Sequence, residues 1–222
     1  MLGRALQILF FCLIVKPVLL IILGVRVKGH ENLPEDGPAI LIANHNSHLD
    51  TLVLMNMYSL RNLRKLRPVA AADYFMKTPL RAWLSTNVIN IIPIARKGKR
   101  TSDPLEPIYD ALDNDQIVIF YPEGSRGEPE KIADFKRGIS ILAEKYPDVS
   151  VAPILTFGLG KALPKGDPVI VPFFVDVIVD KPCKFKDCKT DDFSEFLEQK
   201  LKTLKNGQYF ADYIEENPLV DA

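Results

Sequence analysis

Cysteine is scarce in this chain of 222 residues, which contains only Cys12, Cys183 and Cys188. The last two are spaced C-x4-C, and no second pair follows them. Because zinc sites usually draw four ligands from tight pairs, this spacing argues against a metal site. So few cysteines are most simply explained by a reduced compartment that faces the cytosol. We expect no bound metal and no nucleic-acid partner.

Two loops that often carry chemistry are also missing from the sequence. The stretch Gly124-Ser125-Arg126-Gly127 does not match the G-x-S-x-G turn of serine hydrolases. Gly160-Lys161 lacks the earlier glycine and the following serine or threonine of a Walker loop. The sequence therefore supports neither a serine nucleophile on such a turn nor a P-loop for nucleotides.

Charge is balanced overall but unevenly distributed. The chain has 28 basic and 28 acidic residues, so its net charge gives no sign of an anionic partner. Residues 61–100 contain ten basic residues and a single acid, Asp73, whereas residues 187–222 contain nine acids and four lysines. This pattern favours one face that meets negative charge. Two solvated helix faces of opposite sign are the alternative.

Only one long apolar run is present, from Ala5 to Val25, and Gln7 and Lys16 are its sole polar residues. Its length of about 20 residues would allow a transmembrane helix. However, Lys16 places a charge in the middle of the run, and Pro17 removes a helix hydrogen bond. We therefore expect two short helical pieces that meet at Lys16-Pro17 and lie in one leaflet. The alternatives are a true span, a removed signal peptide and a buried core helix.

Residues 29–222 are expected to form one domain after this membrane-anchoring segment, residues 1–28. Segments typical of strands and helices alternate, which predicts an α/β fold with a central, mostly parallel sheet flanked by helices. The expected strands are 39–43, 68–72, 88–94, 116–121, 150–157 and 169–179, the last as one strand or two. The expected helices are 47–60, 74–86, 103–112, 136–146 and 193–204. In such sheets, functional residues collect where strands end.

The first candidate site follows the strand expected at 39–43. His45 and Asp50 are too far apart around a single helix to touch, but they meet if His45 lies in the loop and Asp50 in the first helical turn. Ser47 is a good N-cap, and Ser47-x-x-Asp50 resembles a capping box. A carboxylate beside His45 would prepare it as a general base. Alternatively, Asp50 only caps the helix; His48 and His30 are expected to have no catalytic role.

The second candidate site follows the strand expected at 116–121. Proline and glycine in Tyr121-Pro122-Glu123-Gly124-Ser125-Arg126-Gly127 hold an unusual backbone at the strand end. Arg126 could bind a phosphate through two hydrogen bonds. Glu123 could accept a hydrogen bond from a substrate hydroxyl or hold Arg126. A plain turn with a surface salt bridge is the alternative.

Taken together, these stretches resemble the motifs of the glycerolipid acyltransferase family, the PlsC-type lysophosphatidic acid acyltransferases and their relatives. The stretches that match in order are Asn44-His45-x-x-x-x-Asp50, Ile91–Arg96, Tyr121–Arg126, Phe135–Gly138 and Val151–Ile154. The resemblance covers roughly residues 27–157. Tyr121, Ser125 and Gly127 replace residues that are more common in the family, and Pro93 lies within the second motif.

The resemblance implies a glycerol-3-phosphate acyltransferase-like fold and an O-acyltransferase reaction without a covalent enzyme intermediate. His45, oriented by Asp50, would deprotonate the acceptor hydroxyl, which would attack the thioester of acyl-CoA or acyl carrier protein. The implied acceptor is 1-acyl-glycerol-3-phosphate, giving phosphatidic acid. The substrate-binding residues implied are Arg96, Glu123, Gly124, Ser125 and Arg126.

No cofactor beyond the thioester co-substrate is implied, and the partners are the phospholipid membrane, the lysophospholipid acceptor and the acyl carrier. The site is expected to face the cytoplasm. Lys97, Lys99, Arg100 and Lys136 are expected to be solvated rather than to attract the carrier or the membrane. The open alternatives are another acceptor (glycerol-3-phosphate, another lysophospholipid or an acylated amino-lipid), a thioesterase, and a non-enzymatic membrane-binding module.

Overall fold

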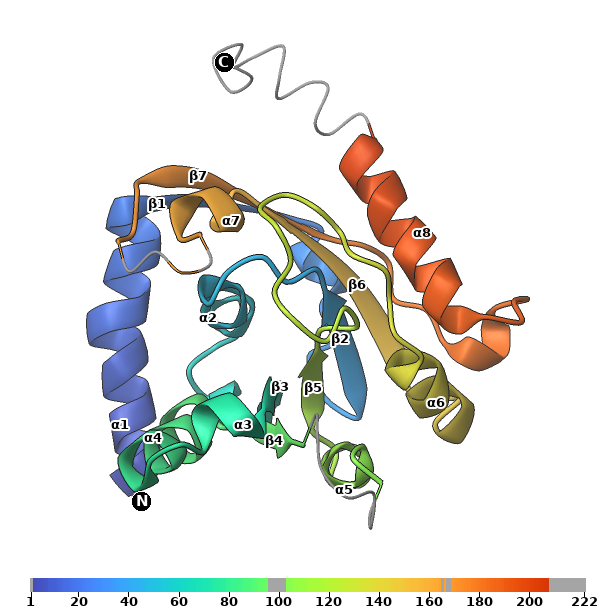
Figure 1. Cartoon of the computed structure of the whole chain (residues 1–222), viewed down its shortest axis with the longest axis horizontal. Coiled ribbons are helices and arrows are strands. Elements are labelled where there is room, and N and C mark those ends of the chain that lie inside the picture. The colour runs from blue at the N-terminus through green and yellow to red at the C-terminus, as the bar shows by residue number, and fades with distance from the viewer. Residues whose placement is uncertain (1, 96–102, 165, 167–168, 208–222) are drawn as a thin grey trace.

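The computed structural model describes residues 2–95, 103–164, 166 and 169–207. Within these residues, seven strands form one sheet in the order β1-β7-β6-β2-β5-β3-β4 (Figure 1). The strands are β1 Leu23–Lys28, β2 Ala39–Ala43, β3 Leu66–Ala71, β4 Ile92–Ile94, β5 Ile117–Phe120, β6 Ser150–Phe157 and β7 Phe173–Val179. The α-helices are α1 Leu2–Phe10, α2 Leu49–Asn56, α3 Ala72–Phe75, α4 Pro79–Leu84, α5 Glu106–Asp113, α6 Gly138–Lys145, α7 Leu159–Ala162 and α8 Phe193–Asn206.

The central strands of the sheet run parallel, which confirms the predicted α/β fold. In the register of β2, Leu41 lies opposite Ile119 of β5 on one side and Ala152 of β6 on the other. Among the described strand pairs, β6 and β7 form the antiparallel one. Strands β2, β5, β3 and β4 therefore end at the same edge of the sheet, where their connecting loops can meet.

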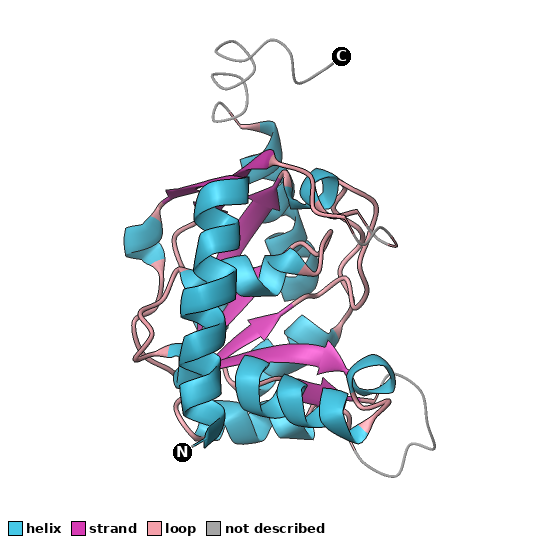
Figure 2. Ribbon diagram, turned by 90° about the vertical axis from the view of Figure 1, so that its left-hand side faces the viewer, coloured by secondary structure: helices cyan, strands magenta, loops and turns pink. Residues whose placement is uncertain are grey.

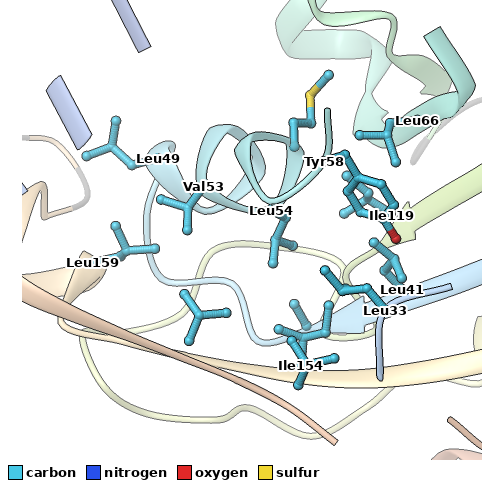
Figure 3. Packing of buried hydrophobic residues seen from close by; sticks show 14 of the residues in the cluster. Leu33, Leu41, Leu49, Val53, Leu54, Tyr58, Leu66, Ile119, Ile154 and Leu159 are labelled. Atoms are coloured by element: carbon cyan, nitrogen blue, oxygen red, sulfur yellow. The ribbon is translucent and has the colours of Figure 1, made fainter. Parts of the chain in front are cut away.

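Each face of the sheet carries a hydrophobic core. Alternation along β2 sends Leu41 into the core shared with α2, and sends Ile40 and Ile42 into the opposite core shared with α5, α6 and α8. Figure 3 shows Val53 and Leu54 of α2 packed over the sheet. Because both faces are covered by helices (Figure 2), the central strands β2 and β5 are continuous apolar runs.

The N-terminal apolar run forms one continuous helix, Leu2–Ile22, long and apolar enough by composition to cross a membrane. The two separate pieces that we predicted at Lys16-Pro17 are not seen. Instead, π-helical turns lie at Phe11–Val15 and Val18–Ile22, on either side of the proline. Pro17 lacks an N–H, and wider turns beside it let the helix continue with altered hydrogen bonding.

A stripe of every fourth residue along this helix packs against the domain. Its members are Gly3, Gln7, Phe11, Val15 and Leu19, and they are buried. In a regular α-helix, residues four apart diverge by about 40° around the axis. The π turns hold more residues per turn, so they keep the stripe on one side. The helix therefore lies along the domain for its whole length.

Residues 23–28, which we placed in the anchoring segment, belong to the sheet. They form edge strand β1, which pairs in parallel with β7. Arg26 forms an ion pair with Asp176 of β7, with Nε and Oδ1 2.9 Å apart. Apolar Leu23, Val25 and Val27 alternate with Gly24, Arg26 and Lys28, a pattern typical of a strand. The pattern is difficult to recognise in the sequence because it directly follows a longer apolar run.

The segment predicted as one helix, 74–86, is divided into α3, α4 and a π turn at Ser85–Ile89. Thr78 accepts a hydrogen bond from the N–H of Arg81, and Pro79 occupies the first helical turn, so α4 starts anew. The strand predicted at 88–94 shrinks to β4, because Val88 belongs to the π turn. Asn90 ends that turn with φ 65°, and its side chain donates a hydrogen bond to the carbonyl of Leu66.

Candidate active site

Both motif segments line one cavity of about 640 Å³ at the carboxyl ends of β2, β3 and β5. His45 and His48 come from the loop after β2, and Gly124, Ser125 and Arg126 from the loop after β5. Parallel strands bring these loops together although they are about 80 residues apart in the chain. This is the location that the sequence predicts.

The contact expected between His45 and Asp50 is present. His45 Nδ1 and Asp50 Oδ2 are 2.9 Å apart, and Asp50 is 0% exposed. Because a carboxylate only accepts, Nδ1 carries the proton and Nε2 is left as an acceptor. The same Oδ2 accepts the backbone N–H groups of Asn46 and Ser47, at 2.8 and 2.9 Å. Asp50 therefore fixes the loop and the imidazole together.

The predicted capping box is formed in part: Oδ2 of Asp50 accepts the N–H of Ser47 at 2.9 Å, as such a box requires. Helix α2 begins at Leu49 and His48 is the residue before it, so Ser47 lies one position outside the cap. Ser47 Oγ instead accepts from the N–H of Leu49, at 3.2 Å, and donates to the carbonyl of Leu163. The half that is missing is the bond from the N–H of Asp50 to Ser47 Oγ, because this N–H donates to the carbonyl of Ser47, at 3.4 Å.

The second motif holds the main chain of His45 from both sides. The N–H of His45 donates to Oε1 of Glu123 at 3.0 Å, and the N–H of Gly127 donates to the carbonyl of His45 at 2.8 Å. Glu123 is only 3% exposed. We expected Glu123 to bind substrate, but the structure places its carboxylate behind the loop, where it positions His45.

Burial also changes the protonation of this carboxyl. Removal from water raises the pKa of Glu123 to about 7, although the N–H groups of His45 and Ala133 partly oppose the rise. Burial also disfavours the charged form of His48, and because that form is the protonated one, the pKa of His48 is lowered. The positive charge of Arg126 lowers it further. His48 is therefore mainly neutral near pH 7.

Tyr121 supports the imidazole from one face. The rings of His45 and Tyr121 stack with centroids 4.1 Å apart and an interplanar angle of 19°. The hydroxyl of Tyr121 lies 2.9 Å from Thr51 Oγ1 in α2. A phenylalanine at this position would stack equally well but would leave the threonine without this partner. The departure from the usual family residue thus adds a link between the two motifs.

Cations occupy the polar wall of the cavity. Arg126 and Ser125 line it, as does Lys136 from the segment before α6. Gly124 has φ +72°, and a Cβ there would lie 2.8 Å from Lys136 Nζ, so the lysine lies over this turn. Arg96, the other predicted phosphate-binding residue, lies outside the described residues, as do Lys97, Lys99 and Arg100.

The opposite wall of the cavity is apolar. Side chains from β3, β4 and the start of α5 contribute to it, including Val69, Ala70, Ile94 and Leu105. Among the described residues, no three histidine, cysteine or acidic side chains lie close enough to hold a metal ion. The cavity thus combines an oriented histidine, positive charge and an apolar surface that suits a hydrocarbon chain.

Comparison with known proteins agrees with this geometry. The sequence profile of the family described as Acyltransferase matches residues 24–157, which run from β1 to the end of β6. The chain belongs to the acyltransferase family. This confirms the resemblance inferred from the motifs, and the matched region includes β1.

Named relatives and a solved structure extend the likeness. The chain is 32% identical to a chloroplastic 1-acyl-sn-glycerol-3-phosphate acyltransferase of Arabidopsis thaliana over 161 residues, 71% of this chain and 43% of the relative. It is 30% identical to the human alpha form over 137 residues, 59% of this chain and 44% of the relative. The chain thus spans about half the length of the curated relatives it matches. The crystal structure of PlsC from Thermotoga maritima shares the fold, with a TM-score of 0.73, 22% identity, and coverage of 92% of this chain and 78% of that one.

Two residues, Asn44 and Lys136, shape the site of this acyltransferase in ways that the sequence analysis did not assign. Asn44, 2% exposed, donates to the carbonyl of Thr156 and accepts from its N–H, both at 2.8 Å, and so ties the end of β2 to β6. An asparagine at a strand end was a visible signal. Lys136 was expected to be solvated, and only the folded chain brings it to the cavity.

Proposed function

We propose that this acyltransferase moves a fatty acyl group from acyl-CoA or acyl carrier protein to the free hydroxyl of 1-acyl-glycerol-3-phosphate. The product is phosphatidic acid, which serves phospholipid synthesis. The observation that carries the proposal is the buried Asp50 at 2.9 Å from His45, with the imidazole lining a cavity that is cationic on one wall and apolar on the other. The names of the relatives support the acceptor.

In this reaction, Nε2 of His45 accepts the proton of the acceptor hydroxyl. The oxygen attacks the thioester carbonyl carbon, a C–O bond forms, and the C–S bond breaks. The thiolate leaves and receives the proton from the imidazolium, which Asp50 stabilises meanwhile. No group on the protein becomes acylated, so both substrates must lie in the cavity at once. Much of the rate enhancement then comes from holding them side by side.

Arg126 and Lys136 favour an acceptor with a phosphate monoester, together with Arg96 from the second motif. A guanidinium and an ammonium match a dianionic headgroup better than a zwitterionic one. A relative in Rhizobium meliloti, 28% identical over 124 residues, is named as a lyso-ornithine lipid O-acyltransferase. An acylated amino-lipid is therefore the second acceptor to test.

The proposed location is the membrane surface, with the site on the cytoplasmic side. The helix Leu2–Ile22 packs lengthwise on the domain through its buried stripe, which supports a helix lying in one leaflet over one that spans the bilayer. All three cysteines are unpaired, which supports a reduced environment.

The direct test is acyl transfer from palmitoyl-CoA to lysophosphatidic acid in detergent, comparing wild type with His45→Ala. We expect phosphatidic acid from wild type and a loss of at least roughly a hundredfold in the variant. His30→Ala is the matched control, because His30 bonds to the carbonyl of Met57 away from the cavity and should leave the rate unchanged.

Equal activity in His45→Ala would overturn the assignment of the base. Transfer only to lyso-ornithine lipid would replace the acceptor. Hydrolysis of palmitoyl-CoA without acceptor, at the rate of transfer, would replace the acyltransferase by a thioesterase.

A further inference from the structure

Helix α4 presents an apolar face to solvent beside the cavity. Leu80 and Leu84, four residues apart, and Trp83 lie on neighbouring positions of this face. Their exposed fractions are 69% for Leu80, 39% for Trp83 and 43% for Leu84. Tyr74 of α3 is 38% exposed as well. A leucine and tryptophan cluster of this kind in water indicates a surface that is covered in use.

Positive charge borders this face. Lys77 and Arg81 are exposed, and both stand over the ring of Tyr74, with Lys77 Nζ 5.9 Å and Arg81 Cζ 5.3 Å from its centroid. The two helices lie within the basic region that the sequence singles out, where Asp73 is the one acid. Apolar side chains rimmed by lysine and arginine, with an aromatic belt, match the acyl and anionic headgroup layers of a phospholipid surface.

The same side of the molecule carries the exposed face of the N-terminal helix. Leu2, Leu9, Leu13, Leu20 and Ile21 are each more than half exposed there. Figures 1 and 2 show the start of α1 beside α4. The contact is close, because a Cβ on Gly3 would lie 3.2 Å from the Cβ of Asn87 in the π turn that follows α4. The two apolar surfaces are therefore neighbours.

Helix α3 joins this surface to the cavity. Tyr74 is exposed on the outer side and also lines the cavity, next to Phe75, and its ring lies 5.7 Å from that of His48. A chain that leaves the bilayer beside α3 would thus meet aromatic and apolar groups before it reaches His45.

We propose that the segment from Ala72 to Leu84 is a second bilayer-contact surface, distinct from the N-terminal helix, and that it places the cavity entrance in the headgroup layer. The occupant is an anionic phospholipid bilayer. The part that concerns substrate access rests on the proposed function, whereas the contact itself does not. In this arrangement, the N-terminal helix supplies most of the binding and α4 sets the tilt of the domain.

The sole tryptophan of the chain lies on the proposed surface, so fluorescence reports on this surface alone. Purified full-length protein is mixed with vesicles of phosphatidylcholine and phosphatidylglycerol, with acyl chains that are either unmodified or brominated near the headgroup end. We expect Trp83 emission to shift to shorter wavelength on binding and to be quenched by the brominated lipid. Co-sedimentation alone would not decide, because the N-terminal helix holds the protein on vesicles in either case.

A matched control moves the reporter to the far side of the molecule. The variant Trp83→Phe with Ile141→Trp places the single tryptophan on α6, where Ile141 is 45% exposed. Its emission should be the same in both vesicle types. Quenching of both reporters would mean that the whole domain is embedded and would overturn the proposal, as would no quenching of Trp83.

Charge reversal tests the two basic residues, Lys77 and Arg81, that border the apolar face. Lys77→Glu with Arg81→Glu should lower the quenching of Trp83 at least threefold in vesicles that contain phosphatidylglycerol. The control, Lys181→Glu with Lys189→Glu, reverses two exposed lysines near α8 and should leave quenching unchanged. If both pairs act alike, net charge and not this surface is responsible. A shift of Trp83 emission that depends on protein concentration without lipid would assign the face to a second copy of the chain.

Activity assays distinguish the bilayer contact itself from its role in substrate access. Leu80→Ser with Leu84→Ser should lower acyl transfer to lysophosphatidic acid in vesicles about tenfold, and transfer in detergent micelles less than twofold. Equal losses in both would contradict the role in substrate access. No transfer by wild type in either system would overturn the proposed function and leave the fluorescence result standing.

Discussion

The two walls of the cavity are built in different ways. On the polar wall, His45 is held by Asp50 through its ring, by Glu123 and Gly127 through its main chain, and by Tyr121 through stacking. On the apolar wall, Val69, Ala70 and Ile94 are held only by strand pairing and packing. The first wall fixes one atom, Nε2 of His45, whereas the second sets only a shape.

This difference indicates where the molecule tolerates change. A buried hydrogen-bonded network loses function when one partner changes, because the groups left behind are unpaired. The free energy of apolar packing changes gradually with side-chain volume, by about 0.8 kcal/mol for each buried methylene. The polar wall should therefore govern whether the reaction occurs, and the apolar wall which acyl chain is used.

The largest effect should follow from Asp50→Asn. An amide oxygen in the place of Oδ2 still accepts from Asn46, Ser47 and Nδ1 of His45. The negative charge that stabilises the imidazolium is lost, however, because the amide is neutral. We expect kcat to fall roughly a thousandfold while the fold is kept. Steady-state kinetics measure the loss, and thermal unfolding checks the fold. Activity within tenfold of wild type would show that the ring of His45 does not depend on this carboxylate.

The next prediction concerns stability. It tests whether the carboxyl of Glu123 is a buried group of the fold rather than a group that binds substrate. Its pKa rises from 4.5 to about 7 on folding, so the folded chain binds this proton more tightly than the unfolded chain. Stability is therefore lost as pH rises through this window. Relative to Glu123→Gln, wild type should lose roughly 3 kcal/mol of unfolding free energy between the two limits.

Chemical denaturation of detergent-solubilised protein below pH 4.5 and above pH 7 measures this difference. Glu128→Gln is the control: Glu128 is exposed, and its hydrogen bond to Lys131 lowers its pKa, so its small contribution has the opposite sign. A wild type that gains stability relative to Glu123→Gln as pH rises would contradict the burial argument.

A smaller effect is expected on the cationic side of the polar wall. Arg126→Gln should reduce kcat/KM for lysophosphatidic acid about thirtyfold, mostly through KM, because the phosphate loses a charged hydrogen-bond partner. Arg137→Gln removes a neighbouring exposed guanidinium outside the cavity and should change little. If Arg126→Gln affects an acceptor without a phosphate monoester equally, its role is structural.

The smallest effect should come from the apolar wall. Ala70→Leu adds bulk to the cavity and should shift the preferred acyl chain to a shorter one, by about fourfold in kcat/KM for each methylene excluded. A series of acyl-CoA lengths at fixed acceptor concentration measures the shift. A uniform loss for all lengths would place the acyl chain elsewhere.

Much of the fold and the His45–Asp50 contact could be predicted because their causes are local. Alternating apolar segments predict the parallel sheet, and a loop followed by a helix predicts that His45 and Asp50 meet. Other features depend on tertiary structure. The burial of Glu123 follows from the approach of two loops far apart in the chain, and β1 is concealed because its apolar residues continue those of the helix before it.

The direct passage from the N-terminal helix into β1, with Ile22 and Leu23 as neighbours, has a consequence for the search for substrate. A flexible tether would let the domain sample a volume above the bilayer and dilute the site with respect to lipid. In the proposed membrane-bound state, a domain without such a tether is confined to lateral diffusion and rotation about the membrane normal. His45 would then stay at a constant depth, and the local concentration of the proposed acceptor would be set by the surface density of lipid rather than by the bulk solution.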